Sequence, residues 1–68
     1  MSQFSSQLKK IRAGSGKRQQ DAADYLGIKL RSYQAYEAGE REPNLDGLIA
    51  LADFFGVSLD ELVGRKEG

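Results

Sequence analysis

Four side chains at helical spacing, those of Leu30, Arg31, Gln34 and Ala35, suit the edges of base pairs. Residues three or four positions apart lie on one face of a helix. Arginine can donate two hydrogen bonds to guanine, glutamine can form two with adenine, and leucine or alanine can touch the methyl group of thymine. The pattern therefore predicts a helix that enters the major groove of double-stranded DNA. The alternative is a merely solvated face, which suits Arg31 and Gln34 but does not explain an exposed Leu30.

The helix that carries these residues is expected from about Leu30 to Ala38. Tyr33 and Tyr36 are three positions apart, so they must provide its apolar contacts to the core. Gly39 follows the last helical residue, where glycine commonly ends a helix. With the two tyrosines turned inward, the opposite face is left free.

A preceding helix is expected over about 18–26, and only Gly27-Ile28-Lys29 separates the two helices. A joint of three or four residues that begins with glycine is the spacing of a helix-turn-helix unit, here about 18–38. So short a joint holds the helices at a steep angle, buries Ile28 between them, and exposes the far face of the second helix.

Apolar periodicity predicts three further helices that support this unit. One spans about 4–13, one follows the N-cap residue Asn44 and ends at Gly56, and the last opens with a capping box from Ser58 to Glu61. The residues expected to face the core from these helices are Phe4, Leu8, Ile11, Leu45, Leu48, Leu51, Ala52, Phe55, Leu59 and Leu62. Most of the core is expected on the helix that follows Asn44.

The fold class predicted from these elements is all-α, a compact five-helix bundle. With 68 residues the chain can support one hydrophobic core, so a single domain is expected. Its bounds are placed at 4–64, and residues 65–68 are expected to be a frayed tail.

Charge is divided unevenly along the chain although the net charge is zero. Residues 1–34 hold seven Lys and Arg against two Asp, a charge of +5, whereas residues 35–68 hold three against eight acidic residues, a charge of −5. A basic half suggests a surface for an anionic partner such as DNA. The alternative is an accident of surface composition.

Composition excludes several function classes. The chain has no Cys and no His, so disulfides, thiolate metal sites and the commonest general base are absent from it. Because no glycine-rich phosphate loop occurs either, we expect no enzyme activity, no cofactor, no metal and no small-molecule ligand. No segment is typical of a signal peptide or a membrane span, so the expected location is cytoplasmic, associated with the nucleoid.

Over Phe4 to Gly64 the chain resembles the Cro and phage-repressor (XRE-like) type of helix-turn-helix domain, whose fold is lambda-repressor-like. The matching features are Leu8-Lys9-Lys10-Ile11-Arg12, Gly16, Gln19, Ala23, Leu26-Gly27-Ile28, Tyr36-Glu37, Gly39-Glu40-Arg41, Pro43 and the run LIALADFFGVSLDEL over 48–62. The resemblance implies a transcriptional regulator, and a repressor is the expected kind.

The resemblance also implies roles for single residues. It places Leu30, Arg31, Gln34 and Ala35 toward bases, in agreement with their spacing, and Gln19 against a phosphate. The N-terminus of a helix attracts anions, and nearby cations add to that attraction. Ser32 could contact either the DNA backbone or a base. The expected phosphate contacts are Lys17, Arg18, Gln19, Lys29 and Arg41.

Arg12 and Glu37 match a charged pair that in the family links the first helix to the end of the third. We interpret the pair as structural: it positions the recognition helix without necessarily adding net stability. The alternative is that Arg12 reaches a phosphate.

Three positions depart from the family pattern, which has an apolar residue at Lys17, a Ser or Thr N-cap at Arg18, and a larger apolar residue at Ala22. A weaker cap and looser packing of the second helix are therefore expected. Tyr33, where the family tends to use an aliphatic residue, is expected to fill the space left by Ala22.

One copy of so small a domain offers a small contact surface, so a homodimer on a palindromic operator is expected, with half-sites about 34 Å apart. Phe54 is the candidate dimer contact because it adjoins Phe55 and both cannot face one core; the alternative is a partly covered surface aromatic.

The rival function is a protein-interaction module, such as a regulator or antitoxin subunit. The basic residues around one helix pair favour DNA binding over a protein-interaction module.

Overall fold

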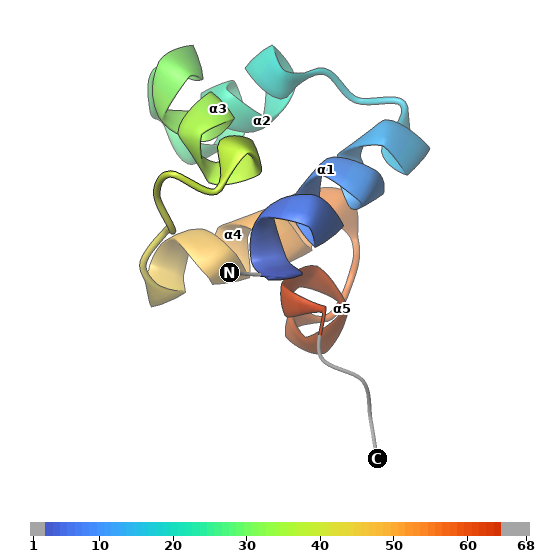
Figure 1. Cartoon of the computed structure of the whole chain (residues 1–68). Helices are drawn as coiled ribbons and strands as arrows, with labels where there is room; N and C mark the ends of the chain where they lie inside the picture. Colours follow the sequence, from blue (N-terminus) through green and yellow to red (C-terminus); the bar gives the residue numbers. More distant parts are fainter. Residues whose placement is uncertain (1–2, 65–68) are drawn as a thin grey trace.

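The computed structural model describes residues 3–64, and within them the chain forms five α-helices and no strand (Figure 1). The predicted all-α five-helix fold is confirmed. The fraying predicted for residues 65–68 lies outside the described residues. The helices are α1 (Gln3–Ser15), α2 (Gln19–Leu26), α3 (Leu30–Ala38), α4 (Leu45–Phe55) and α5 (Leu59–Val63).

The end of α1 differs from the prediction. The helix was expected to stop at Ala13, but it continues through Gly14 to Ser15, and Gly16 with φ 76° ends it. A single glycine inside a helix costs only about 1 kcal/mol, so it does not force an end. The Ser15 hydroxyl donates to the Arg12 carbonyl at 2.7 Å and accepts from the Lys17 N–H at 3.1 Å, which stabilises the last turn.

The caps predicted for α4 and α5 are present. Asn44 Oδ1 accepts a hydrogen bond from the Gly47 N–H at 2.9 Å. Ser58 Oγ accepts from the Glu61 N–H at 3.0 Å, and Glu61 Oε1 accepts from the Ser58 N–H at 3.2 Å. These bonds satisfy backbone donors that a helix start leaves without partners, so they fix where both helices begin.

All five helices contribute to the core. Its buried members are Phe4, Leu8, Ala22, Ala23, Tyr33, Leu51, Ala52 and Leu62. The prediction that α4 supplies most of the core is wrong, because Leu48 and Phe55 are only partly buried and Leu45 is 64% exposed. Leu59, also predicted inward, is 39% exposed. Leu45 and Leu59 are the first residues of their helices, where side chains tilt toward the N-terminus and beyond the packed turns.

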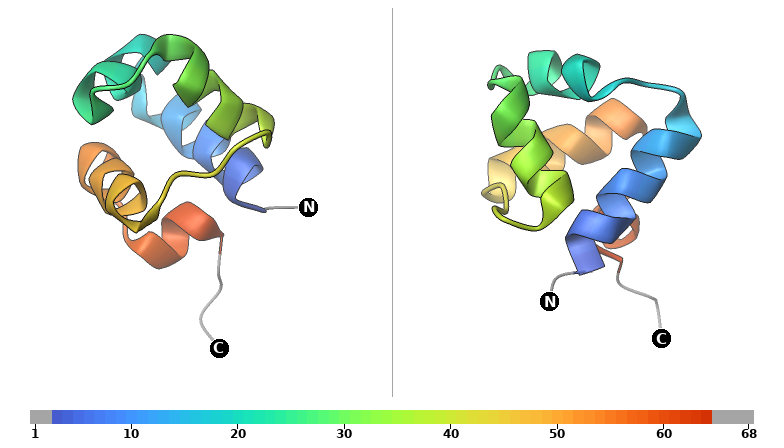
Figure 2. Two further views of the ribbon diagram at one scale, coloured as in Figure 1. Left: turned by 90° about the vertical axis from the view of Figure 1, so that its left-hand side faces the viewer. Right: turned by 45° about the horizontal axis from the view of Figure 1, so that its top comes forward.

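The helices pack so that α2 and α3 lie together, away from α5 (Figures 1 and 2). α3 packs against α1 and α2, α2 also packs against α4, and α5 packs against α1 and α4. The helix predicted to read DNA is therefore held from two sides, and its remaining side faces outward. None of the helices within residues 3–64 is long and apolar enough to span a membrane.

Candidate nucleic-acid interface

The joint between α2 and α3 has the predicted length and conformation. Gly27 adopts a left-handed conformation with φ 71°, and its N–H bonds to the Asp24 carbonyl at 3.1 Å. The Ile28 N–H returns to the Ala23 carbonyl at 3.0 Å, which closes the end of α2. Ile28 packs against the core but is only partly buried, so its predicted burial between the helices is incomplete. The joint runs over the surface, where one side of Ile28 remains open.

The two faces of α3 are arranged largely as the spacing predicts. Tyr33 is fully buried and Tyr36 is partly buried, with the two rings 6.3 Å apart and edge to face. On the opposite side Arg31 and Gln34 are exposed, whereas the candidates Leu30, Ser32 and Ala35 are partly buried. Leu30 therefore differs from the freely exposed residue that was expected, although it lies outside the core cluster.

A buried carboxylate, that of Glu37, connects α3 to α1 and α2. Its side chain is 3% exposed and bonds to the Nε of Arg12; Arg12 Nη2 also donates to it at 3.3 Å. The Tyr33 hydroxyl donates at 2.7 Å and Gln19 Nε2 at 3.1 Å. The structural pairing predicted for Arg12 and Glu37 is therefore present, and Arg12 uses its guanidinium for contacts within its own chain, which include a bond to the Lys17 carbonyl at 3.3 Å.

These contacts stabilise the charged form of Glu37. Burial raises the pKa of this carboxyl group, but the hydrogen bonds from Arg12, Tyr33 and Gln19 together lower it by more than burial raises it. The pKa therefore lies below its ordinary value. The hydrogen bond to Glu37 raises the pKa of Arg12. Burial, followed by the hydrogen bond to Glu37, raises the pKa of Tyr33 far above its ordinary value. The site thus contains a fixed ion pair beside a neutral phenol.

Sequence reasoning missed the roles of the Tyr33 hydroxyl and of Gln19 in this cluster. Tyr33 and Glu37 are four positions apart on α3, which is a spacing that signals side-chain contact. Ala22 and Tyr33 are both fully buried in the core, and that the tyrosine fills the space left by the small residue stays a prediction. Within residues 3–64 no buried side-chain nitrogen or oxygen lacks a hydrogen-bond partner.

The start of α2 is capped in an unusual way. The Arg18 side chain has only donors and accepts nothing from the helix, as the sequence predicted. Instead Asp21 accepts from the Arg18 N–H at 2.9 Å and from the Arg18 guanidinium at 2.9 Å, and the hydrogen bonds from Arg18 lower the pKa of Asp21. Arg18, a candidate phosphate contact, is therefore paired within the chain, although its side chain remains 77% exposed.

The remaining cationic candidates are spread over the surface. Lys17, Lys29 and Arg41 are all exposed, and Lys29 directly precedes α3 as its N-cap residue. The Lys17 ammonium lies 5.3 Å from the centre of the Phe54 ring. Arg41 lies beyond the C-terminus of α3 and lines a hollow with Leu26 and Ile28, at the other end of α2 from Lys17. Gln19, by contrast, meets Gln34 directly: Gln34 Nε2 donates to Gln19 Oε1 at 3.2 Å.

Phe54, the candidate dimer contact, has neighbours within its own chain. Its ring lies 4.9 Å from the rings of both Tyr25 and Phe55. Phe54 is half-buried, while Tyr25 is 55% exposed. The surface aromatic in this region is therefore the pair of Tyr25 and Phe54, with Tyr25 the more accessible member.

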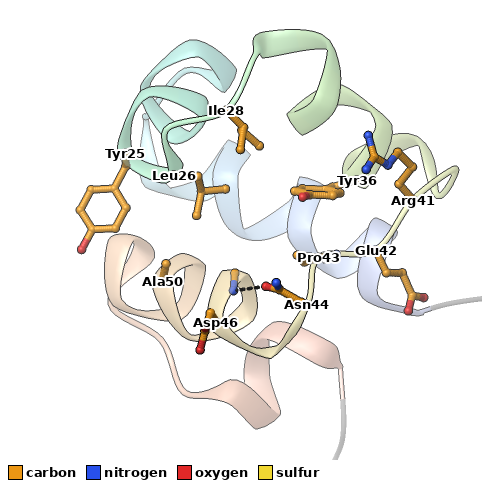
Figure 3. Close-up of a pocket in the computed structure, with 11 residues that line it drawn as sticks. Tyr25, Leu26, Ile28, Tyr36, Arg41, Glu42, Pro43, Asn44, Asp46 and Ala50 are labelled. Carbon is orange, nitrogen blue, oxygen red and sulfur yellow. Dashed lines mark hydrogen bonds between the residues drawn. The ribbon is translucent and has the colours of Figure 1, made fainter.

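An open hollow of about 540 Å³ lies between the α2–α3 joint and the start of α4 (Figure 3). Leu26, Ile28 and Tyr36 form its apolar side, and Arg41 and Asp46 lie among its polar residues. No group of three or more His, Cys, Asp or Glu residues that could hold a metal ion occurs within residues 3–64.

Comparison with known proteins finds relatives of this chain. A family described as helix-turn-helix matches residues 8–62. A prophage-derived, uncharacterized HTH-type transcriptional regulator of Bacillus subtilis, YonR, is 45% identical over 60 residues, which are 88% of this chain and 56% of that protein. The transcriptional repressor RstR of the cryptic phage CTXphi, from Vibrio cholerae, is 44% identical over 54 residues, 79% of this chain and 48% of that protein.

A solved structure agrees with these matches. The crystal structure of a transcriptional regulator from Listeria innocua superposes with a TM-score of 0.88 at 32% identity, covering 100% of this chain and 64% of the other. The chain spans about half the length of the two curated relatives. All three of these proteins carry the word regulator or repressor in their names.

Proposed function

This chain belongs to the helix-turn-helix family, in its Cro and phage-repressor form, and from that membership we propose that it binds DNA sequence-specifically and regulates transcription as a repressor. The observation that carries the proposal is the outward face of α3, where Arg31 and Gln34 are exposed and Gln34 meets Gln19 at the start of α2. The proposed DNA-binding domain is residues 4–64, with the helix-turn-helix unit at about 18–38.

In this proposal α3 enters the major groove. Arg31 and Gln34 bond to base edges, Leu30 and Ala35 touch thymine methyl groups, and Ser32 lies within reach of a base or the backbone. Phosphate contacts come from the backbone N–H groups at the start of α2 and from the residues around it. The proposed phosphate-binding side chains are Lys17, Arg18, Gln19, Lys29 and Arg41.

The pairing of Arg12 with Glu37 supports a positioning role for this ion pair. Glu37 lies on α3 and receives hydrogen bonds from α1 and α2, so it fixes the angle at which α3 leaves the domain. A pair that is nearly buried adds little net stability but is costly to break on one side only. Arg12 is accordingly not among the proposed phosphate contacts.

We further propose that the protein acts as a homodimer on a palindromic operator, because one domain offers a small contact area. Phe54 is the proposed dimer contact, with Tyr25 as the exposed ring beside it. Sedimentation equilibrium tests this proposal: Tyr25→Ser and Phe54→Lys should both shift the protein toward the monomer. Unchanged association in both variants would remove this aromatic pair as the interface.

The function itself is tested by selecting duplexes from a random pool with the wild-type chain at about 0.15 M salt. The expected result is a palindrome whose half-sites lie about one helical turn apart. Lys17→Ala should then weaken binding to every sequence alike and reduce the salt slope by about one. If no sequence is enriched, a protein-interaction module becomes the better account of this chain.

A further inference from the structure

The side-chain amide of Gln19 forms hydrogen bonds through both its nitrogen and its oxygen. Its Nε2 donates to Glu37 Oε1 at 3.1 Å, and its Oε1 accepts from Gln34 Nε2 at 3.2 Å. A continuous chain of hydrogen bonds therefore runs from a buried carboxylate on α3, through the start of α2, to an exposed side chain on the outer face of α3. Gln19 and Gln34 are 15 positions apart in the sequence, and only the helix-turn-helix brings them together.

The direction of each bond in this chain is fixed by chemistry. An ionised carboxylate only accepts hydrogen bonds, so Gln19 must present its NH₂ group to Glu37. The carbonyl oxygen of Gln19 then faces Gln34, and because that oxygen also only accepts, Gln34 must present an N–H. The Oε1 of Gln34 and one remaining N–H are thereby left for an external partner.

We propose that Glu37 determines, through Gln19, which base Gln34 reads. The inference rests on the proposed function, because it requires that Gln34 faces the major groove. An outward Oε1 accepts from the amino group of adenine or cytosine, and the remaining N–H donates to adenine N7. Gln34 held in this orientation therefore selects adenine first, and it disfavours guanine and thymine, which present a carbonyl oxygen.

The contacts of Glu37 predict the effect of replacing the carboxylate with an amide. Oε2 accepts from Arg12 Nε and the Tyr33 hydroxyl, whereas Oε1 accepts from Arg12 Nη2 and Gln19. In Glu37→Gln the single carbonyl oxygen is best placed at the Oε2 position, between the Tyr33 hydroxyl and Arg12 Nε. The new NH₂ group then faces Arg12 Nη2, whose bond at 3.3 Å is lost, and Gln19, which turns over to accept from it. Gln34 turns over with Gln19. An outward NH₂ on Gln34 would favour guanine or thymine.

The test measures affinities for the site that the wild-type chain selects, with all four bases placed at each position in turn. Gln34→Ala identifies the position that this residue reads, as the one where discrimination is lost. There the wild-type protein should prefer adenine over guanine and thymine by about tenfold. Gln19→Met, which keeps the side-chain length but has no amide, should reduce that preference to about twofold. In the Gln34→Ala background it should leave the base ratios unchanged, even if it lowers the overall affinity.

Glu37→Gln should reverse the preference toward guanine or thymine at the same position. The control Tyr33→Phe keeps the carboxylate and should keep the adenine preference even though it is less stable. Circular dichroism verifies folding, and Gln19→Met decides the question where Glu37→Gln does not fold, because Gln19 is only partly buried. If Gln19 served only as a phosphate contact, its loss in Gln19→Met would lower all affinities equally and leave the base ratios unchanged.

The inference is overturned if the wild-type chain selects a site but Gln19→Met leaves the adenine preference intact. It is also overturned if Gln34→Ala changes no position. A wild-type chain that selects no site at all refutes the proposed function itself, and with it this inference. The two failures are therefore distinguished by the wild-type selection alone.

Discussion

Replacing Tyr33 with phenylalanine removes one oxygen atom from the core and leaves the ring in place. The hydroxyl donates to Glu37 at 2.7 Å, and Tyr33 is fully buried, so water cannot replace the lost bond. A hydrogen bond to a charged group contributes about 1.5–3 kcal/mol. The free energy of unfolding of a 68-residue domain is about 3–10 kcal/mol. Tyr33→Phe should therefore remove a large fraction of the stability.

Urea denaturation followed by far-ultraviolet circular dichroism measures this loss. The midpoint should fall while the slope m stays constant, because the native surface hardly changes. Tyr36→Phe is a matched control, since no hydrogen bond of its hydroxyl occurs within residues 3–64, and its effect should stay within about 0.5 kcal/mol. A loss as small in Tyr33→Phe as in this control would refute the reasoning.

A double-mutant cycle separates the charged hydrogen bond from other effects of the hydroxyl. In a Glu37→Gln background the phenol would bond to a neutral amide, which contributes about 0.5–1.5 kcal/mol. Tyr33→Phe should then cost about half as much as it does in the wild-type protein. Equal costs in the two backgrounds would show that the charge of Glu37 is irrelevant to the bond.

Three further predictions concern the stability of the fold. Because the folded-state pKa of Glu37 lies below its ordinary value of 4.5, its contribution is complete above that pH and is lost as the pH falls through the folded pKa; thermal melts of Glu37→Gln should show a shallower acid loss than wild type, and parallel curves would contradict this. Ala22→Leu should destabilise by about 1–3 kcal/mol, because the added atoms crowd a fully buried site that the packing hypothesis fills with Tyr33, and a clear rise in melting temperature would refute that hypothesis. Asn44→Ala should cost about 1 kcal/mol in chemical denaturation because it removes the bond to Gly47, and an unchanged midpoint would exclude this cap as a source of stability.

Features that depend on neighbouring residues could be predicted from the sequence. Gly27 and Gly39 end their helices in the left-handed conformation, and Asn44 and Ser58 cap the next two, because each of these residue types acts on backbone groups within three or four positions. The inward turn of Tyr33 could be predicted in the same way from helical periodicity. Local chemistry was therefore sufficient for the element order and for the free face of α3.

Features that depend on packing could not be predicted. Leu45 and Leu59 fit the apolar period, yet both are exposed, because each is the first residue of its helix and its side chain tilts beyond the packed turns. The contacts of Gln19 with Glu37 and Gln34 join positions 18 and 15 apart, so they exist only when α2 and α3 have docked.

The central claim, that the outer face of α3 reads bases, is tested most directly by comparing two arginine variants in a selection from random duplexes. Arg31 lies on the exposed face of α3, and Arg41 lies beyond its C-terminus. Arg31→Ala should relax one position of the selected site, at a cost of about 1–3 kcal/mol, whereas Arg41→Ala should preserve the motif and weaken all sequences alike. A motif that is unchanged in Arg31→Ala would contradict the account, because another surface of the domain would then have to read the DNA.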